Sequence, residues 1–262
     1  MARRIADGSS IAVGGSFLHR GPFALIRELV RRGASGLELI KQSPGYDVDL
    51  LCRARCVDRV RAGIVALEGN FGLAKWYREA IESGRVRLEE HACMSLTSGL
   101  RAAAYGHPFQ PCAGLHGSDL PKLNGWVEIP DPYGSGATSF LIPRIQPDFA
   151  LIHVNEIDED GNARVYGTAH WDRIMSRAAR RVFVVAERVV PKERFQEQPE
   201  LTLIPGFMVE AAAVVPGAAW PGSSFPYYGV DYDAVERYLE DTPQALDAHL
   251  AEAPESKGQR HA

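Results

Sequence analysis

The chain lacks several features that would assign it to a class at once. No apolar run approaches the ~20 residues that a membrane-spanning helix requires, so we expect no membrane insertion. The opening residues, MARRIADGSS, contain arginines but no apolar segment of the kind found in secretion signals. The formal net charge is −4, so the chain has no positive excess that would attract nucleic acid. We therefore expect neither a membrane nor a nucleic-acid partner.

Cysteine is scarce, with four in 262 residues. A chain of this length can bury a core without disulfides, so these cysteines do not predict a disulfide framework. Cys52 and Cys56 have arginines between them, and no second pair of ligands follows at a zinc-site spacing. We therefore expect no metal site and a reduced, cytoplasmic protein.

What the chain does contain is an alternation of short apolar runs and amphipathic stretches. The predicted strands are residues 10–15, 36–40, 61–67, 148–154, 181–187 and 209–215, and the predicted helices are 22–31, 74–83 and 171–179. The nearly continuous apolar character of these strands predicts an α/β fold, a mostly parallel open sheet with helices on both faces. We expect one domain over residues 1–240, followed by a polar C-terminal tail over residues 241–262.

The most informative stretch runs from Glu89 to Asp119. Two adjacent glutamates precede a helix of small residues, which we expect to end at Gly106 in a loop with two histidines and an aspartate. Adjacent residues of an extended segment point to opposite faces, so only one of Glu89 and Glu90 is expected to enter a pocket. Taken by itself, the pattern fits an ordinary helix cap and surface loop equally well.

A second candidate is the loop that begins at Gly14 and Gly15, between a predicted strand and a predicted helix. It has neither the G-K-[ST] of a phosphate-binding loop nor the G-x-G-x-x-G dinucleotide fingerprint. Glycines let a backbone approach a ligand closely, and Arg20 could pair with a carboxylate or phosphate. The alternative is a tight turn with a surface arginine.

Several motifs, taken together and in order, resemble a known family. They are GGSFLHRGPFALIRELVRRG, the EE–GLRAAAYGHPFQP–GLHGSDL block, VEIPDPYGSG, LIPRIQPDFALIHVNEIDEDGNARVYG, RIMSRAARRVFVVAERVV and VVPGAAWPGSSFPYYGVD. From about residue 10 to residue 238 the chain is similar to the A subunit of family I CoA-transferases, particularly the glutaconate CoA-transferase group.

That resemblance implies an α/β, CoA-transferase subunit-like fold and a heteromeric enzyme, with a B subunit as partner in a heterotetramer of two A and two B subunits. The substrates would be an acyl-CoA and a carboxylic acid, with coenzyme A as co-substrate and no further cofactor. In the family a glutamate attacks the thioester, and it usually lies on the B subunit. The A-subunit positions that resemble the wall of the acyl pocket are Gly14, Gly15, Ser43, Glu68 and Cys93.

The resemblance leaves two further functions open. Cys93 stands where many oxoacid CoA-transferases have an amide side chain, so an oxyanion donor of that type is replaced here. Some related A/B pairs act as ring-opening hydrolases of steroid-derived CoA thioesters and rely on a glutamate of the A subunit. Glu90 is the candidate for that catalytic residue and Glu89 its competitor. A non-catalytic scaffold subunit is the remaining alternative; a sugar-phosphate-responsive repressor is disfavoured because no basic DNA-binding helix pair is present.

Overall fold

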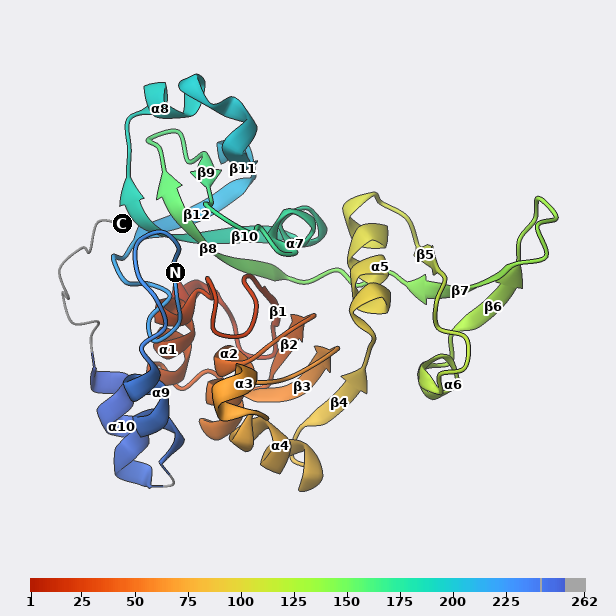
Figure 1. Ribbon diagram of the computed structural model, residues 1–262, viewed down its shortest axis with the longest axis horizontal. Helices are drawn as coiled ribbons and strands as arrows, with labels where there is room; N and C mark the ends of the chain where they lie inside the picture. The colour runs from red at the N-terminus through yellow and green to blue at the C-terminus, as the bar shows by residue number, and fades with distance from the viewer. Residues whose placement is uncertain (241, 253–262) are drawn as a thin grey trace.

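The computed structural model describes residues 1–240 and 242–252 and contains a large, mostly parallel sheet (Figure 1). Its parallel strands, in spatial order, are β4 (Arg87–Glu90), β3 (Val57–Ala62), β2 (Leu37–Lys41), β1 (Ser10–Val13), β8 (Phe149–Ile157), β10 (Arg181–Val189) and β12 (Val209–Val214). Two short antiparallel strands, β9 (Ala163–Arg164) and β11 (Thr202–Ile204), extend it beside the end of β8.

Helices cover both faces of this sheet. One face packs against α1 (Phe23–Arg31), α2 (Tyr46–Arg53) and α4 (Lys75–Glu82), and the other against α5 (Cys93–Ala104) and α7 (Asp172–Ala178). Strand residues alternate between the two cores: Ile11 and Val13 belong to the first, whereas Ala12 belongs to the second. This alternation, with both faces buried, explains the continuous apolar strands of the sequence. The expected fold class is confirmed.

The structure also contains short helical segments: α3 (Glu68–Phe71), α6 (Leu120–Asn124), α8 (Lys192–Glu197), and 3₁₀ turns at Ala2–Arg4, Pro199–Leu201 and Gly206–Met208. A separate antiparallel sheet of β5 (Phe109–Cys112), β7 (Thr138–Pro143) and β6 (Val127–Pro130) follows α5. In Figure 1 this small sheet projects away from the main body. Its surroundings include exposed apolar side chains, with Leu123 72% and Val127 60% exposed.

Two local expectations were wrong. The strand expected at 61–67 lies at Val57–Ala62, because Val57 and Val60 are buried while Arg59 and Arg61 between and after them are polar. The observed strand alternates between apolar and polar residues, whereas the apolar run that predicted a strand follows it in the chain. That run lies partly in a loop, where Ile64 is 54% exposed. The loop expected after Gly106 contains strand β5, whose backbone pairs with β7.

The last elements of the described residues are α9 (Tyr232–Leu239) and α10 (Pro243–Ala251), which pack beside α1 and α2 in Figure 1. His249 of α10 is buried, and its Nε2 lies 2.6 Å from the Tyr46 hydroxyl in a setting that also includes Trp220 and Tyr238. Residues 241 and 253–262 of the predicted tail lie outside the described residues, and the division at residue 240 stays a prediction. Across the described ranges no helix is both long and apolar enough to cross a membrane.

The docking of α10 is expected to weaken in acid. Burial, assisted by the charges of Arg27 and Arg53, lowers the pKa of His249 to about 3 from its ordinary 6.5. A His with a depressed pKa stabilises the fold fully above pH 6.5, and that stability falls as the pH drops from 6.5 toward 3. Hydrogen exchange of α10, corrected for intrinsic rates, should show protection falling by about 1–2 kcal/mol between pH 7 and pH 5.

The matched control is His249→Gln, which can still hydrogen-bond to Tyr46 but does not titrate in this range. It should remove most of the pH dependence, whereas the exposed His107→Gln should not. Equal protection of α10 at both pH values in the unaltered chain would contradict the expectation.

Candidate functional site

The residues expected to line a substrate pocket gather at the carboxyl ends of β1, β2 and β3. Gly14 and Gly15 follow β1, and Ser43 follows β2, where its carbonyl accepts the Phe17 N–H at 2.9 Å. Cys93 begins α5 with its Sγ 4.0 Å from the Gln42 carbonyl. Ligands of open α/β sheets bind at this edge, so the placement agrees with the expected role, which stays a prediction.

Two buried ion pairs fix the Gly14–Gly15 loop. Arg20 Nη1 lies 3.0 Å from Asp172 Oδ2, and Asp172 Oδ1 accepts the Gly15 N–H at 2.9 Å. On the other side Lys41 Nζ lies 2.5 Å from Asp47 Oδ2 and donates to the Gly14 carbonyl at 2.9 Å. Arg20 therefore pairs with a carboxylate of its own chain, and not with a free ligand as the sequence suggested.

Both glycines have a steric reason to be glycine. A Cβ at position 14 would lie 2.9 Å from Asp172 Oδ1, and one at position 15 would lie 2.4 Å from the His19 carbonyl oxygen. Gly15 also has φ +74°, a conformation that side chains rarely adopt. The Gly14 and Gly15 amides donate to Leu151 and Asp172 respectively, so the loop presents an ordered turn to the edge and keeps both amides inside.

Glu68 is the charged residue among those expected to line the pocket, and its side chain has a partner that the sequence did not reveal. Its Oε1 lies 2.9 Å from His19 Nε2, and both side chains are partly exposed. Glu68 adopts φ +65°, and His19 lies between Phe17 at φ +47° and Arg20 at φ +52°. Strained backbone of this kind clusters at functional sites, which marks this corner of the edge.

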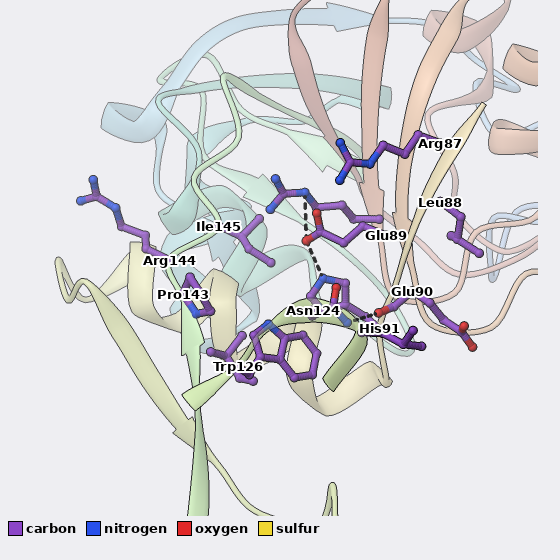
Figure 2. A pocket seen from close by; sticks show the side chains of 13 residues that line it. Arg87, Leu88, Glu89, Glu90, His91, Asn124, Trp126, Pro143, Arg144 and Ile145 are labelled. Atoms are coloured by element: carbon purple, nitrogen blue, oxygen red, sulfur yellow. Dashed lines mark hydrogen bonds and ion pairs between the residues drawn. The ribbon is translucent and has the colours of Figure 1, made fainter. Parts of the chain in front are cut away.

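Glu90 lies at the end of β4, beside a cavity of about 540 Å³. The cavity lining comprises Arg61, Arg87, Leu88, Glu89, Glu90, His91, Leu123, Asn124, Trp126, Ile142, Pro143, Arg144 and Ile145. Figure 2 shows the two glutamates pointing in opposite directions, as the alternation of a strand requires. Glu89 points toward arginine and His91, and the exposed Glu90 carboxyl points away.

Glu89 is held as an anion. It forms ion pairs with Arg59 and with Arg61, the latter at 3.5 Å, and His91 Nε2 lies 3.1 Å from its Oε1. Burial raises the pKa of this carboxyl, but the His91 hydrogen bond and the two arginines outweigh it and lower the pKa to about 2. Such a carboxylate is a weak base at neutral pH.

The Glu90 carboxyl has no ion pair or hydrogen bond within residues 1–240 and 242–252, where its carbonyl accepts from Asn124 at 3.0 Å. Arg87 and Arg144 on the same cavity wall are exposed, and among the described residues neither guanidinium has an ion-pair partner. The cavity wall thus carries two accessible cations, whereas the accessible Glu90 carboxyl points in the opposite direction from Glu89. Within the same described part of the chain, no cluster of three or more His, Cys, Asp or Glu is arranged to hold a metal ion.

Sequence reasoning missed His19 and Ser223, whose side chains lie at this edge. Ser223 Oγ is 2.6 Å from His19 Nδ1, although 204 positions separate the two residues in the chain. Both residues occur in motifs that the sequence singled out, the glycine loop and the late proline-rich loop. No periodicity links such distant loops, so only the folded sheet brings them together.

Comparison with known proteins finds a matching family and relatives that cover most of this chain. Residues 1–214 match the family described as Coenzyme A transferase. A protein of Archaeoglobus fulgidus is 36% identical over 90% of this chain and 53% of its own length, so the chain spans about half of that relative. The cholesterol ring-cleaving hydrolase IpdA subunit of Mycobacterium tuberculosis is 31% identical over 90% of this chain and 84% of its own. The A subunit of glutaconate CoA-transferase from Acidaminococcus fermentans is 28% identical over 92% and 82%.

Solved structures give the same picture. The decarboxylase AibA/AibB superimposes with a TM-score of 0.87 at 30% identity, covering 96% of this chain and 95% of that chain. The glutaconate coenzyme A-transferase of Acidaminococcus fermentans superimposes with a TM-score of 0.86 at 26% identity, covering 94% and 84%. The agreement in fold extends over nearly the whole chain.

Replacing Lys41 by Met is expected to destabilise the protein by about 3–5 kcal/mol, because Asp47 would be left as an uncompensated buried charge. Chemical denaturation at pH 7 measures this. Arg78→Met, which breaks an exposed pair with Glu82, is the control and should leave the midpoint unchanged. Equal midpoints for the two variants would contradict the role given to the buried pair.

The ion pairs and the His91 hydrogen bond of Glu89 predict that the free energy of unfolding depends on pH in the acid range. Its depressed pKa means that the stabilisation is present above about pH 4.5 and is lost as the pH falls toward 2. Glu89→Gln should therefore lower the free energy of unfolding at pH 7 by about 1–3 kcal/mol, with a smaller difference at pH 3. Glu90→Gln is the control at pH 7, where it should change that free energy by less than about 0.5 kcal/mol. An equal effect of Glu89→Gln at both pH values would contradict the stabilisation of the Glu89 anion by these partners.

Proposed function

Because the chain belongs to the coenzyme A transferase family, we propose that it is the A subunit of a heteromeric enzyme that transfers CoA between an acyl-CoA and a carboxylic acid. The observation that carries this proposal is the TM-score of 0.86 with glutaconate coenzyme A-transferase over 94% of the chain. Two relatives that match over most of their length are named as the A subunits of CoA-transferases, which supports a B subunit as the partner. We place two A and two B subunits in the complex.

The cavity beside β4 suits such substrates. CoA carries phosphates and the acceptor acid carries a carboxylate, and arginine binds both groups well. Arg87 and Arg144 are exposed on the cavity wall, and Trp126 and the exposed Leu123 supply apolar surface for an acyl chain. Coenzyme A enters as a co-substrate in this proposal, and the chemistry needs no other cofactor. The four free thiols agree with a cytoplasmic location, which belongs to the same proposal.

The residues proposed to line the acyl pocket are those at the strand edge. Ser43, Glu68 and Cys93 lie at successive points of that edge, beside the ordered Gly14–Gly15 turn. An oxyanion in the transition state needs preorganised donors. Cys93 offers a thiol in place of an amide, so we propose that most of this donation comes from the partner subunit.

A second function, ring-opening hydrolysis of a steroid-derived acyl-CoA, is favoured by the 31% identity with the ring-cleaving hydrolase subunit. In that case Glu90 is the catalytic carboxylate, since Glu89 is occupied by arginines and has a pKa of about 2. Glu90 would act as a base toward water once the partner covers it. A non-catalytic scaffold role is the remaining candidate.

The three functions are separated by one experiment. The chain is co-expressed with its B-type partner and incubated with a panel of acyl-CoAs, with and without acceptor carboxylates, and products are followed by mass spectrometry. A new acyl-CoA that needs the acceptor demonstrates transfer. Acceptor-independent addition of water, seen as ring opening or as CoA release, demonstrates hydrolysis. Carbon dioxide is also monitored because of the similarity to a decarboxylase. If neither product forms with any acyl-CoA of the panel, the proposal is overturned.

Glu90→Gln is expected to lower the rate of hydrolysis by about 10²–10⁴-fold if hydrolysis is the reaction. It should change transfer less than about tenfold if a partner glutamate is the nucleophile. The matched control is Glu79→Gln on the exposed surface of α4, which should leave both rates unchanged. Full activity of both Glu89→Gln and Glu90→Gln would support the scaffold role and contradict a catalytic one.

A further inference from the structure

The imidazole of His19 lies between two side chains that come from distant loops and contacts both. Its Nδ1 lies 2.6 Å from Ser223 Oγ and its Nε2 lies 2.9 Å from Glu68 Oε1. The backbone fixes the arrangement, since the Arg20 N–H donates to the Ser223 carbonyl and the Ser223 N–H donates to the Leu18 carbonyl, each at 2.8 Å. The contact is therefore not a chance meeting of two flexible side chains.

The charge of Glu68 decides which nitrogen of His19 is the base. An ionised carboxylate only accepts hydrogen bonds, so Nε2 must carry a proton to bond with it. In the neutral imidazole Nδ1 then has a free electron pair, and the Ser223 hydroxyl donates to it. A hydroxyl hydrogen-bonded to a base that a third group orients is the arrangement of an activated nucleophile.

The surroundings support a functional reading of this arrangement. His19 retains 45% of its side-chain surface and Glu68 25%, so reactants can reach the group. Of the five non-glycine residues with positive φ in the described chain, Phe17, Arg20 and Glu68 flank or belong to it. His170 adds a fourth; burial, with a contribution from Arg20, lowers its pKa to about 4, so it adds no positive charge near His19 at neutral pH.

We propose that Ser223, His19 and Glu68 form a catalytic triad in which Ser223 accepts an acyl group from a thioester. The C–S bond breaks as Ser223 Oγ bonds to the acyl carbon, and the hydroxyl proton passes through His19 to the sulfur, so that CoA leaves as a thiol. Water then attacks the ester, returns a proton to Ser223 through His19, and releases the carboxylic acid. Glu68 is the positioning residue. The choice of a CoA thioester as substrate rests on the proposed function; the triad itself rests on the geometry.

A fluorophosphonate, which forms a covalent adduct with activated serines, tests the triad without any assumption about the substrate. The complex of this chain with its partner is incubated with the probe, and the peptide containing Ser223 is analysed by mass spectrometry. We expect an adduct on Ser223, absent in Ser223→Ala and slowed by at least about 100-fold in His19→Asn. Ser16→Ala in the same turn, whose contacts to His19 are made by backbone atoms, is the matched control and should leave labelling unchanged.

Nuclear magnetic resonance of the imidazole nitrogens provides a second readout, and its main measurement uses the unaltered complex. The unaltered complex should show His19 protonated at Nε2 and unprotonated at Nδ1, and Glu68→Gln should weaken that preference while Glu68→Asp restores it. The opposite tautomer in the unaltered protein, or a complex with no adduct on Ser223, would overturn the triad. CoA transfer without an adduct overturns the triad and leaves the proposed function standing. An adduct without transfer or hydrolysis supports the triad and overturns the proposed function.

Discussion

Two buried ion pairs, Lys41–Asp47 and Arg20–Asp172, are the constraint on which the strand edge depends. They lie on opposite sides of the Gly14–Gly15 turn, and each also binds its backbone, through the Gly14 carbonyl and the Gly15 amide. An uncompensated buried charge is costly, so the turn cannot move without breaking a pair. Asp47 also accepts the Gly45 and Val48 amides at the start of α2, which extends the same constraint to the loop that carries Ser43.

This rigidity explains why strained residues are tolerated nearby. Arg20 is anchored through its guanidinium to Asp172 and to two carbonyls, so its positive φ is held by contacts elsewhere. The neighbouring His19 inherits a fixed position and meets Glu68 and Ser223. The Gly14–Gly15 turn thus fixes the positions of side chains at the strand edge, and its own amides point into the protein.

The sequence predicted the fold class and most strands, because parallel strands buried on both faces leave continuous apolar runs. It misplaced β3, whose Arg59 and Arg61 lie on the face that carries the Glu38 and Glu89 ion pairs. It also placed Ser43 and Glu68 at strand ends, and the structure has them after β2 and β3, since the carboxyl ends of parallel strands lie at one edge. Their role in substrate binding stays a prediction. The pairing of Arg20 with Asp172, and of His19 with Ser223, could not be predicted, because such contacts depend on the packing of loops about 150 to 200 positions apart.

The contrast between Glu89 and Glu90 bears on why such an enzyme is divided between two chains. Two arginines and His91 satisfy Glu89 within this chain, and its pKa of about 2 leaves it little basicity. Glu90 is free but exposed to water, and a carboxylate gains reactivity as base or nucleophile when water is removed from it. Nothing in the described chain covers Glu90, so a partner surface must do so for that residue to react. For the proposed hydrolysis, in which Glu90 is the catalytic carboxylate, dependence on a B subunit therefore follows from the exposure of this side chain.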